Sequence, residues 1–339
     1  MYNQLPDVGG KDSTMGNFGV DGAAADRILQ GEGVAVLIPC YNEALTVANV
    51  VDGFRKQLPL ATIYVYDNNS SDGTGAIAES HGAVVRLETR QGKGNVVRSM
   101  FREVEADYYL MVDGDDTYPA ESARALLEPL VYGRADITVG DRLSNGSYGK
   151  ENDRAFHGFG NNLVRWLIKA IYGFAFEDVM TGYRAFTRAF VKTMPVQSEG
   201  FQIETEISIH AVDKRWRVED VPITYRDRPE GCESKLSTFS DGARVIAAIV
   251  SLFKDCKPMM FFGLVAAVLL ALGLLAGVPV VLEYGTTGYV TKLPSALLAV
   301  GLVFLGALSL ACGLVLDTTA KYNRIRYEME VLRVYGEKR

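Results

Sequence analysis

The sequence predicts an α/β domain built on a mostly parallel sheet, followed by two membrane-spanning helices. In the first half of the chain, short apolar runs typical of buried parallel strands alternate with segments whose apolar residues recur at helical spacing. Further along, residues 259–282 and 293–316 are uncharged apolar stretches of 24 residues each. Each is longer than the roughly 20 residues that cross a bilayer core as a helix. A buried helix of a soluble protein is the alternative for either one, and two in tandem disfavour it.

Length and composition set bounds on the class of protein. The 339 residues, 48% of them hydrophobic, suffice for one full-sized core and a second module. The formal net charge of −6 argues against a surface that binds nucleic acid. The cysteines have no paired spacing, so we expect reduced thiols, with neither a disulfide framework nor a zinc site. They are Cys40, Cys232, Cys256 and Cys312.

Strand and helix alternate from residue 34 onward, which is the pattern of an α/β domain. Residues 44–57 have helical spacing between the first two strands, and Lys93 lies between two glycines at the start of a later helix. Asp72 is placed to cap the helix after the second strand. We expect a closing strand within residues 216–225. The strands predicted before it are residues 34–39, 62–66, 83–87, 108–112 and 136–140.

The fourth of these strands stops at a cluster of carboxylates. Its apolar residues run directly into Asp113, Gly114 and Asp115. Ligands of open α/β sheets bind just beyond the carboxyl ends of the strands, which places Asp113 and Asp115 at the rim of a binding crevice. Hard cations such as Mg²⁺ or Mn²⁺ favour carboxylate oxygens and take further ligands from water and substrate phosphates. The alternative is a solvated turn, because Asp and Gly are common in turns.

Polar or charged residues also follow the other predicted strands. One such strand end is ordinary, but several along one edge of a parallel sheet describe a site. The residues concerned are Asn42, Glu43, Asp67, Asp72, Lys93, Asp113, Asp115 and Arg142.

Composition divides the chain into five segments. Lys254 and Lys257 precede the first apolar stretch, and basic residues also follow the second, so the positive-inside bias places both ends of the hairpin in the cytoplasm. Residues 241–257 mix apolar and basic residues and suit a helix lying along the membrane surface. The segments are a flexible amino-terminal tail (1–30), the α/β domain (31–238), a juxtamembrane amphipathic helix (239–258), two transmembrane helices (259–317) and a cytoplasmic carboxyl-terminal tail (318–339).

Six short motifs carry a resemblance. They are Ile-Pro-Cys-Tyr-Asn-Glu at 38–43, the Asp-rich and Ser-rich residues 67–74, Gly-Lys-Gly at 92–94, Asp-Gly-Asp at 113–115, Thr-Gly-Tyr-Arg-Ala-Phe at 181–186 and Ser-Lys-Leu at 234–236. Together and in this order they resemble family 2 glycosyltransferases, which have the Rossmann-like GT-A fold. Within that family the pattern is similar to the polyprenyl-phosphate glycosyltransferases, relatives of dolichol-phosphate mannose synthase. The paired apolar stretches match the bacterial membrane-anchored members.

On the donor side, the resemblance implies a site for a nucleotide-sugar. Asp113 would contact the ribose and approach the metal, and Asp115 would bind the Mg²⁺ or Mn²⁺ that bridges the donor diphosphate. The charge that grows on the leaving diphosphate also calls for basic side chains. Residues of the same motifs would frame the base and ribose or lie beside them: Pro39, Tyr41, Asn42, Glu43, Asp67, Asn68 and Asp72.

The resemblance also assigns basic residues to phosphate groups. Arg142 and Arg154 match ligands of the acceptor phosphate, and guanidinium forks suit phosphate oxygens. Arg184 either orients a phosphate or braces its own loop. The candidates for the donor diphosphate, each of which alone is alternatively a solvated surface charge, are Lys93, Arg228 and Lys235. The residues we assign to catalysis are Asp115, Arg142, Arg154 and Lys235.

A lipid phosphate acceptor would need no strong general base, because its oxygen is already largely anionic at neutral pH. Glu204 and Glu206 resemble the carboxylates that serve as bases in relatives with hydroxyl acceptors, and a structural role is the alternative. Their spacing of two places them on different helix faces, so we expect at most one to point into the site. Thr117 stands where close relatives carry a Gln that helps to hold the metal.

The sequence therefore predicts an inverting glycosyltransferase. It would transfer a hexosyl group from a nucleotide diphosphate sugar, UDP-linked in preference to GDP-linked, to polyprenyl phosphate such as undecaprenyl phosphate. We expect it at the cytoplasmic face of a bacterial inner membrane, in cell-envelope glycan modification, as a homo-oligomer with a tetramer as one form. One alternative is a processive polysaccharide synthase, although this sequence lacks the Gln-x-x-Arg-Trp segment that such relatives usually carry. The other is an inactive scaffold that binds nucleotide-sugar, against which Asp113 and Asp115 argue.

Overall fold

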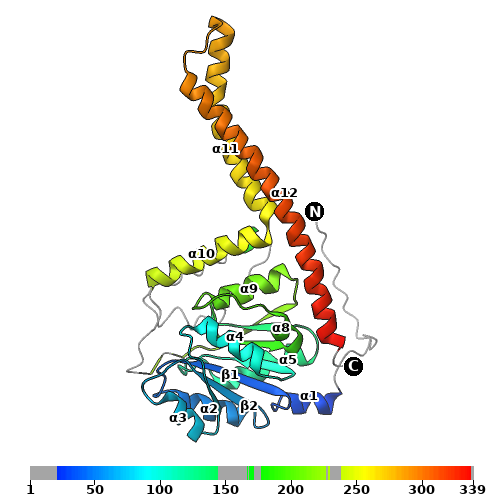
Figure 1. Ribbon diagram of the computed structural model, residues 1–339. Coiled ribbons are helices and arrows are strands. Elements are labelled where there is room, and N and C mark those ends of the chain that lie inside the picture. The colour runs from blue at the N-terminus through cyan, green and yellow to red at the C-terminus, as the bar shows by residue number, and fades with distance from the viewer. Residues whose placement is uncertain are drawn as a thin grey trace.

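The computed structural model has an α/β domain from which a pair of long helices projects (Figure 1). It describes residues 21–143, 166, 168–171, 177–226, 228–229 and 238–336, with side chains from residue 245 onward in the last range. Within these residues, one seven-stranded sheet runs in the order β3-β2-β1-β4-β6-β5-β7. The predicted mostly parallel sheet is therefore confirmed.

Six of the strands point in one direction, and β6 runs antiparallel to its neighbours β4 and β5. The sequence analysis predicted no strand at β6, because four residues inside a polar motif have no strand periodicity of their own. The bounds are β1 Val34–Cys40, β2 Thr62–Asp67, β3 Val84–Leu87, β4 Tyr108–Met111, β5 Ile137–Asp141, β6 Arg184–Thr187 and β7 Val218–Pro222.

Helices cover both faces of the sheet, and side chains alternate between two cores. Along β1, Leu37 joins one core while Ile38 joins the other, as the two-residue repeat of a strand requires. The first core packs under α4 (Lys93–Glu103), α8 (Arg188–Thr193) and α9 (Ile203–Asp213). The second packs under α2 (Val47–Gln57), α3 (Thr74–Ser80) and α5 (Ala123–Val131), the last following the short 3-10 helix η1 (Ala120–Ser122).

The predicted amphipathic helix before the first apolar stretch is α10 (Thr238–Cys256). It crosses above α9 in Figure 1. Its Val245 and Ile249 are buried in the first core, whereas Ile246 and Val250, on the adjoining face of the helix, are exposed. The helix is therefore apolar toward the domain and also toward its surroundings, as a helix lying at a membrane surface would be.

Two helices are long and apolar enough to cross a membrane: α11 (Pro258–Thr287) and α12 (Leu293–Gly336). They pack against each other through small residues, since a Cβ added at Gly273 would lie 2.9 Å from Val303 and one at Gly306 would lie 3.0 Å from Leu270. In each most apolar window, only 17% of the residues are buried. Their outer faces therefore present apolar surface that lipid would cover.

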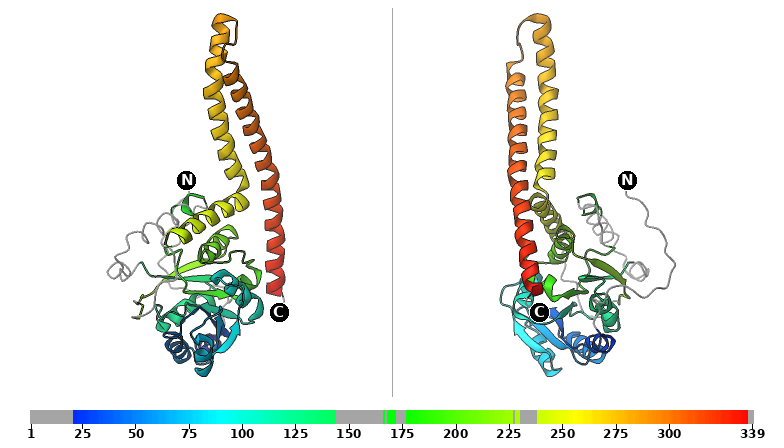
Figure 2. Two further views of the ribbon diagram at one scale, coloured as in Figure 1. Left: turned by 60° about the vertical axis from the view of Figure 1, so that its left-hand side comes forward. Right: turned by 90° about the vertical axis from the view of Figure 1, so that its right-hand side faces the viewer.

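The described parts of the two predicted tails, residues 21–30 and 318–336, are largely helical. Gly22–Ile28 forms the helix α1 with Ala25 buried, although residues 1–30 were expected to be a flexible tail. The expected tail from residue 318 continues α12, which passes down the side of the domain (Figure 2). There the hydroxyl of Tyr327 lies 2.9 Å from Nε1 of Trp216 and 3.0 Å from Nε2 of His210. The second apolar helix is thus anchored on the domain it leads back to.

Candidate active site

The acidic rim, which we define as Asp113 and Asp115, follows directly after β4 at the carboxyl edge of the sheet. Gly114 between them is closely packed: its carbonyl accepts a 2.6 Å hydrogen bond from Oγ1 of Thr46, and an added Cβ would lie 2.6 Å from Sγ of Cys40. A Cβ at Gly182 would lie 2.4 Å from Oδ2 of Asp113. The absence of a side chain at Gly182 therefore leaves the space that the Asp113 carboxylate occupies.

Asp113 is one of two carboxylates that hold Lys93. The Nζ of Lys93 lies 2.5 Å from Oδ1 of Asp113 and 2.5 Å from Oε1 of Glu204. Burial alone would lower the pKa of Lys93, but the two carboxylates outweigh it and raise that pKa above its usual value. Lys93 is therefore a positive charge held beside the rim.

The two glutamates of α9 point in different directions, as their spacing predicts. Glu204 faces Lys93, whereas Glu206 accepts backbone hydrogen bonds of 2.8 Å from Gln197 and 2.7 Å from Ser198. Glu206 thus fixes the chain that leads into α9. Glu204 is the one of the pair that reaches the site, and its charge is already matched by a lysine.

Asp115 is 7% exposed at its side chain and has partners on both oxygens. Oδ1 accepts a 2.7 Å hydrogen bond from Oγ1 of Thr117, and Oδ2 lies 2.7 Å from Nη2 and 2.9 Å from Nε of Arg228. Attraction to Asp115 raises the pKa of Arg228 against the opposing effect of burial. Arg228 therefore supplies the positive charge that this nearly buried carboxylate needs.

The rim fits a hard divalent cation that is also held by substrate. Its donors are carboxylate oxygens, and within the described residues no cluster of three or more His, Cys, Asp or Glu side chains forms a complete protein cage. Mg²⁺ is commonly bound by one or two carboxylates together with phosphate oxygens and water. Two aspartates beside two basic side chains match that pattern. They do not match a structural metal site in which the protein supplies every ligand.

Most of the predicted donor motifs lie at the carboxyl ends of β1 and β2, where their side chains join two loops. Nitrogen of Ser71 donates to Oδ1 of Asn42, and Asp72 accepts from the nitrogens of Ala44 and Thr74, just before α3 begins. Related contacts join Asp67 to Ser70 and Glu43 to Thr74. Pro39 is half-buried and Tyr41 is 40% exposed, so these two can still contact a base.

Asn68 differs from the donor-binding role predicted for it. Its side chain is almost fully buried; Nδ2 donates to the carbonyls of Glu88 and Arg90, and Oδ1 accepts a 2.7 Å bond from the nitrogen of Gly92. Both donors of Nδ2 and one of the two lone pairs of Oδ1 are thus used within the protein. Asn68 therefore positions the loop that begins α4, and with it Lys93.

On the predicted acceptor side, Arg142 lies just after β5 and is held by a residue that the sequence analysis missed. Its Nε lies 2.6 Å from Oδ2 of Asp178, and its Nη2 lies 3.0 Å from Oδ1. The guanidinium carbon is 5.3 Å from the ring centre of Tyr225 and 6.0 Å from that of Tyr118. A bidentate ion pair and two aromatic rings thus fix the orientation of Arg142.

Arg184 lies away from any solvent-accessible site. It is fully buried and donates to the carbonyls of Thr181 and Val179 and to Oγ of Ser208, at 3.0, 2.6 and 3.0 Å. Of the two alternatives for this residue, the geometry matches the brace and not the phosphate contact. Besides Arg142, the basic residues assigned to catalysis are Arg154 and Lys235, and both lie outside the described residues.

An open, mostly parallel sheet with an acidic rim and flanking cations is the arrangement that the sequence analysis expects of a glycosyltransferase. The family model described as "Glycosyl transferase family 2" matches residues 35–193. Glycosyltransferase AglJ of Haloferax volcanii is 36% identical over 244 residues, which are 72% of this chain and 79% of that protein. The chain belongs to glycosyl transferase family 2.

Two further comparisons bear on acceptor and fold. The undecaprenyl-phosphate mannosyltransferase of Micrococcus luteus is 27% identical over 229 residues, covering 63% of this chain and 91% of that protein. The crystal structure of glucosyl-3-phosphoglycerate synthase from Mycobacterium tuberculosis, in complex with Mn²⁺ and UDP-glucose, has a TM-score of 0.56 at 20% identity and covers 68% of this chain and 82% of that one. The likeness confirms the predicted GT-A fold.

Proposed function

We propose that the protein transfers a hexosyl group from a nucleotide diphosphate sugar to a polyprenyl phosphate, and that undecaprenyl phosphate and a UDP-sugar are its acceptor and donor. The observation that carries this proposal is the meeting of an acidic rim with three ion-paired cations, Lys93, Arg142 and Arg228, at one edge of the sheet. Such a site has groups for a donor diphosphate and for a second phosphate. A relative named for transfer to undecaprenyl phosphate supports the lipid acceptor.

The proposed chemistry is a single displacement. An oxygen of the acceptor phosphate attacks the anomeric carbon, while the bond from that carbon to the diphosphate oxygen breaks and its electron pair leaves with the nucleoside diphosphate. One displacement inverts the anomeric configuration. The attacking oxygen is already largely anionic near neutral pH, so no residue has to remove a proton. Glu204, which is ion-paired with Lys93, then has an electrostatic role in place of a basic one.

The basic residues divide between the two phosphate groups. Lys93 and Arg228 lie against the rim and would stabilise the charge that develops on the leaving diphosphate. Arg142, held by Asp178, would orient the acceptor phosphate. A Mg²⁺ or Mn²⁺ held by Asp113 and Asp115 would add positive charge beside the diphosphate oxygens.

The apolar hairpin would hold this site close to its lipid substrate. Because the end of α12 contacts the domain through Arg324 and Tyr327, both ends of the hairpin lie on the domain's side, which supports a two-span anchor with both ends in the cytoplasm. Exposed apolar faces on α11 and α12 would also suit packing between copies in a homo-oligomer, a tetramer among other forms. The mass of the detergent-solubilised protein would test that state.

Reconstitution tests the reaction directly. The full-length protein is incubated with polyprenyl phosphate, Mg²⁺ or Mn²⁺, and labelled UDP-hexoses or GDP-mannose in separate reactions. We expect one lipid-linked hexose with the anomeric configuration opposite to that of the donor, and loss of product with EDTA. Asp115→Asn should abolish transfer, whereas Asp116→Asn, in the same loop but facing Arg226, should retain it. No transfer from any of these donors would contradict the proposal, and a polymeric product would identify a processive synthase.

A further inference from the structure

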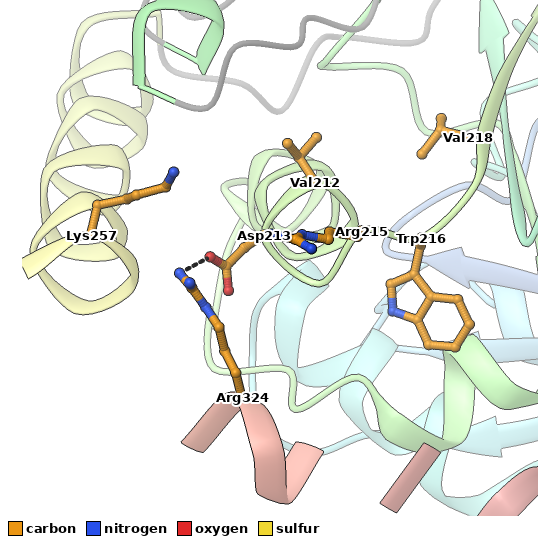
Figure 3. A pocket seen from close by; sticks show the side chains of 7 residues that line it. All are labelled: Val212, Asp213, Arg215, Trp216, Val218, Lys257 and Arg324. Atoms are coloured by element: carbon orange, nitrogen blue, oxygen red, sulfur yellow. Dashed lines mark hydrogen bonds and ion pairs between the residues drawn. The ribbon is translucent and has the colours of Figure 1, made fainter. Parts of the chain in front are cut away.

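A cavity lies where the α/β domain meets the base of the apolar hairpin. Its volume is about 410 Å³, and its walls come from the end of α9, the start of β7, the junction of α10 with α11, and α12 (Figure 3). Glu204, which reaches the candidate active site, lies near the opposite end of α9 from Asp213 in this cavity, about 14 Å away along the helix axis. The cavity is therefore separate from the acidic rim.

The cavity has an excess of positive charge. Arg215, Lys257 and Arg324 line it together with a single carboxylate, Asp213, whose Oδ1 lies 3.0 Å from Nη2 of Arg324. Figure 3 shows the three basic side chains reaching it from three different elements. The remaining lining residues are apolar: Val212, Trp216 and Val218. A cationic pocket with partly apolar walls matches an anion that carries hydrocarbon.

The position of Lys257 places this pocket at the level of lipid headgroups. Lys257 is the N-cap of α11, and the uncharged apolar run of that helix begins two residues later at Met259. Two residues of helix span about 3 Å, whereas the headgroup layer extends about 5 to 7 Å beyond the hydrocarbon core. The amino-terminal end of a 30-residue helix adds its own partial positive charge there.

The backbone at Arg215 has an uncommon conformation. The nitrogens of Arg215 and Trp216 donate to the carbonyls of Val212 and Ala211, which is the Schellman arrangement that ends a helix. Arg215 has φ 58°, at the position of this motif that usually carries glycine or asparagine. The chain thus keeps a basic side chain where the backbone favours another residue, and that side chain lines the cavity.

We propose that this cavity binds the phosphate-bearing headgroup of an anionic phospholipid, with Arg215, Lys257 and Arg324 as its ligands. The proposal rests on the hairpin lying in a bilayer, as in the proposed function, but not on the transfer reaction. A lipid held there would contact the domain, α11 and α12 at once, and would stabilise the orientation of the active site toward the membrane. Basic pockets beside membrane helices on the cytoplasmic side bind acidic headgroups on the same principle.

The test measures lipid binding by the full-length protein in micelles of a neutral detergent. Phosphatidylglycerol or phosphatidylcholine is added to the micelles at increasing mole fraction, and native mass spectrometry counts the lipid molecules that each protein retains. We expect selective retention of phosphatidylglycerol, weakened about five-fold by Arg215→Asn and by Lys257→Gln, and about 25-fold by the double variant. Lys254→Gln removes an exposed charge from α10 outside the cavity and should leave retention unchanged. Because asparagine suits the backbone at 215, Arg215→Asn should keep the melting temperature in phosphatidylcholine micelles.

Several outcomes would overturn the proposal. Equal retention of phosphatidylglycerol by the native protein and the double variant would do so, as would an equal loss in Lys254→Gln, since the effect would then be general surface charge. Inorganic phosphate at millimolar concentration serves as the soluble probe. If it displaced the lipid and raised the melting temperature as much as phosphatidylglycerol does, the cavity would be a site for free phosphate. None of these readouts needs activity, so failure here is distinguishable from failure of the proposed reaction.

Discussion

Replacing Asp178 with asparagine should cost the protein more stability than removing the whole ion pair. Asp178 is fully buried and holds Arg142, whose side chain is only 11% exposed, through two hydrogen bonds of 2.6 and 3.0 Å. Asp178→Asn removes the buried carboxylate that pairs with a guanidinium of little access to water. Breaking a buried pair from one side typically costs about 3 to 5 kcal/mol. The Coulomb energy of two unit charges 4 Å apart, about 4 kcal/mol at an effective dielectric constant of 20, has the same size.

The double variant separates this electrostatic cost from a packing cost. With Arg142→Gln added, no buried charge lacks a partner, so the loss of stability should fall to about 1 to 2 kcal/mol, although two residues have changed. A double-mutant cycle compares the native protein, the two single variants and the double variant. The coupling free energy from this cycle should exceed about 2 kcal/mol. Apparent melting temperatures in detergent should show the single variant about 10 °C below the native protein and the double variant well above the single.

Activity gives the second readout of the same cycle. Because Asp178 acts through Arg142, both single variants should raise KM for polyprenyl phosphate at least ten-fold while leaving KM for the nucleotide-sugar within about two-fold. If the double variant were as unstable as the sum of the singles, the two charges would not be coupled. If Asp178→Asn changed only the donor KM, Arg142 would not belong to the acceptor side.

Three further changes test other parts of the structure. Gly182→Ala should push the Asp113 carboxylate aside and lower kcat about 100-fold while the protein stays folded by circular dichroism. Burial raises the pKa of Asp220 to about 6, so ionisation of this residue destabilises the fold as pH rises through 4 to 6. Asp220→Asn should therefore add about 2 kcal/mol to the free energy of unfolding at pH 7. The melting temperature of the variant should be higher than that of the native protein and should change less with pH. Tyr327→Phe should cost about 1 to 3 kcal/mol and speed proteolysis of α12, whereas Tyr322→Phe, at an exposed position, should do neither.

The parts of the site that could be predicted from the sequence are those that local pattern determines. A buried strand has to be apolar, and parallel strands all end at one edge, so the position of Asp113 and Asp115 follows from residues 108–115 alone. Lys93 follows in the same way, because it begins the helix after β3, another parallel strand of the same sheet. The spacing of Glu204 and Glu206 on α9 also sufficed to predict that only one of them reaches the site.

The parts that could not be predicted depend on contacts between distant residues. Asp178 meets Arg142 across 36 positions of sequence, and no periodicity signals such a pair. The direction of Arg184 depends on β6 pairing antiparallel with β4, in a register that places Met111 opposite Arg184. For Tyr118 the sequence did offer a signal, since an aromatic residue directly after an acidic motif is placed to line the same crevice; it was assigned no role, and its ring lies beside Arg142.

Arg228 illustrates how charge balance connects the folded state to the proposed reaction. Asp115 is nearly buried, and a carboxylate in that position is costly without a cation, so Arg228 stabilises the rim in the protein alone. In the proposed donor complex, a divalent cation would meet this need, and Arg228, still 31% exposed at its side chain, would be available to the diphosphate. Lys93 has no such freedom, because it is only 11% exposed and is held by both Asp113 and Glu204. The site therefore contains one cation that is fixed and one that can exchange partners, and only the second should respond to donor binding.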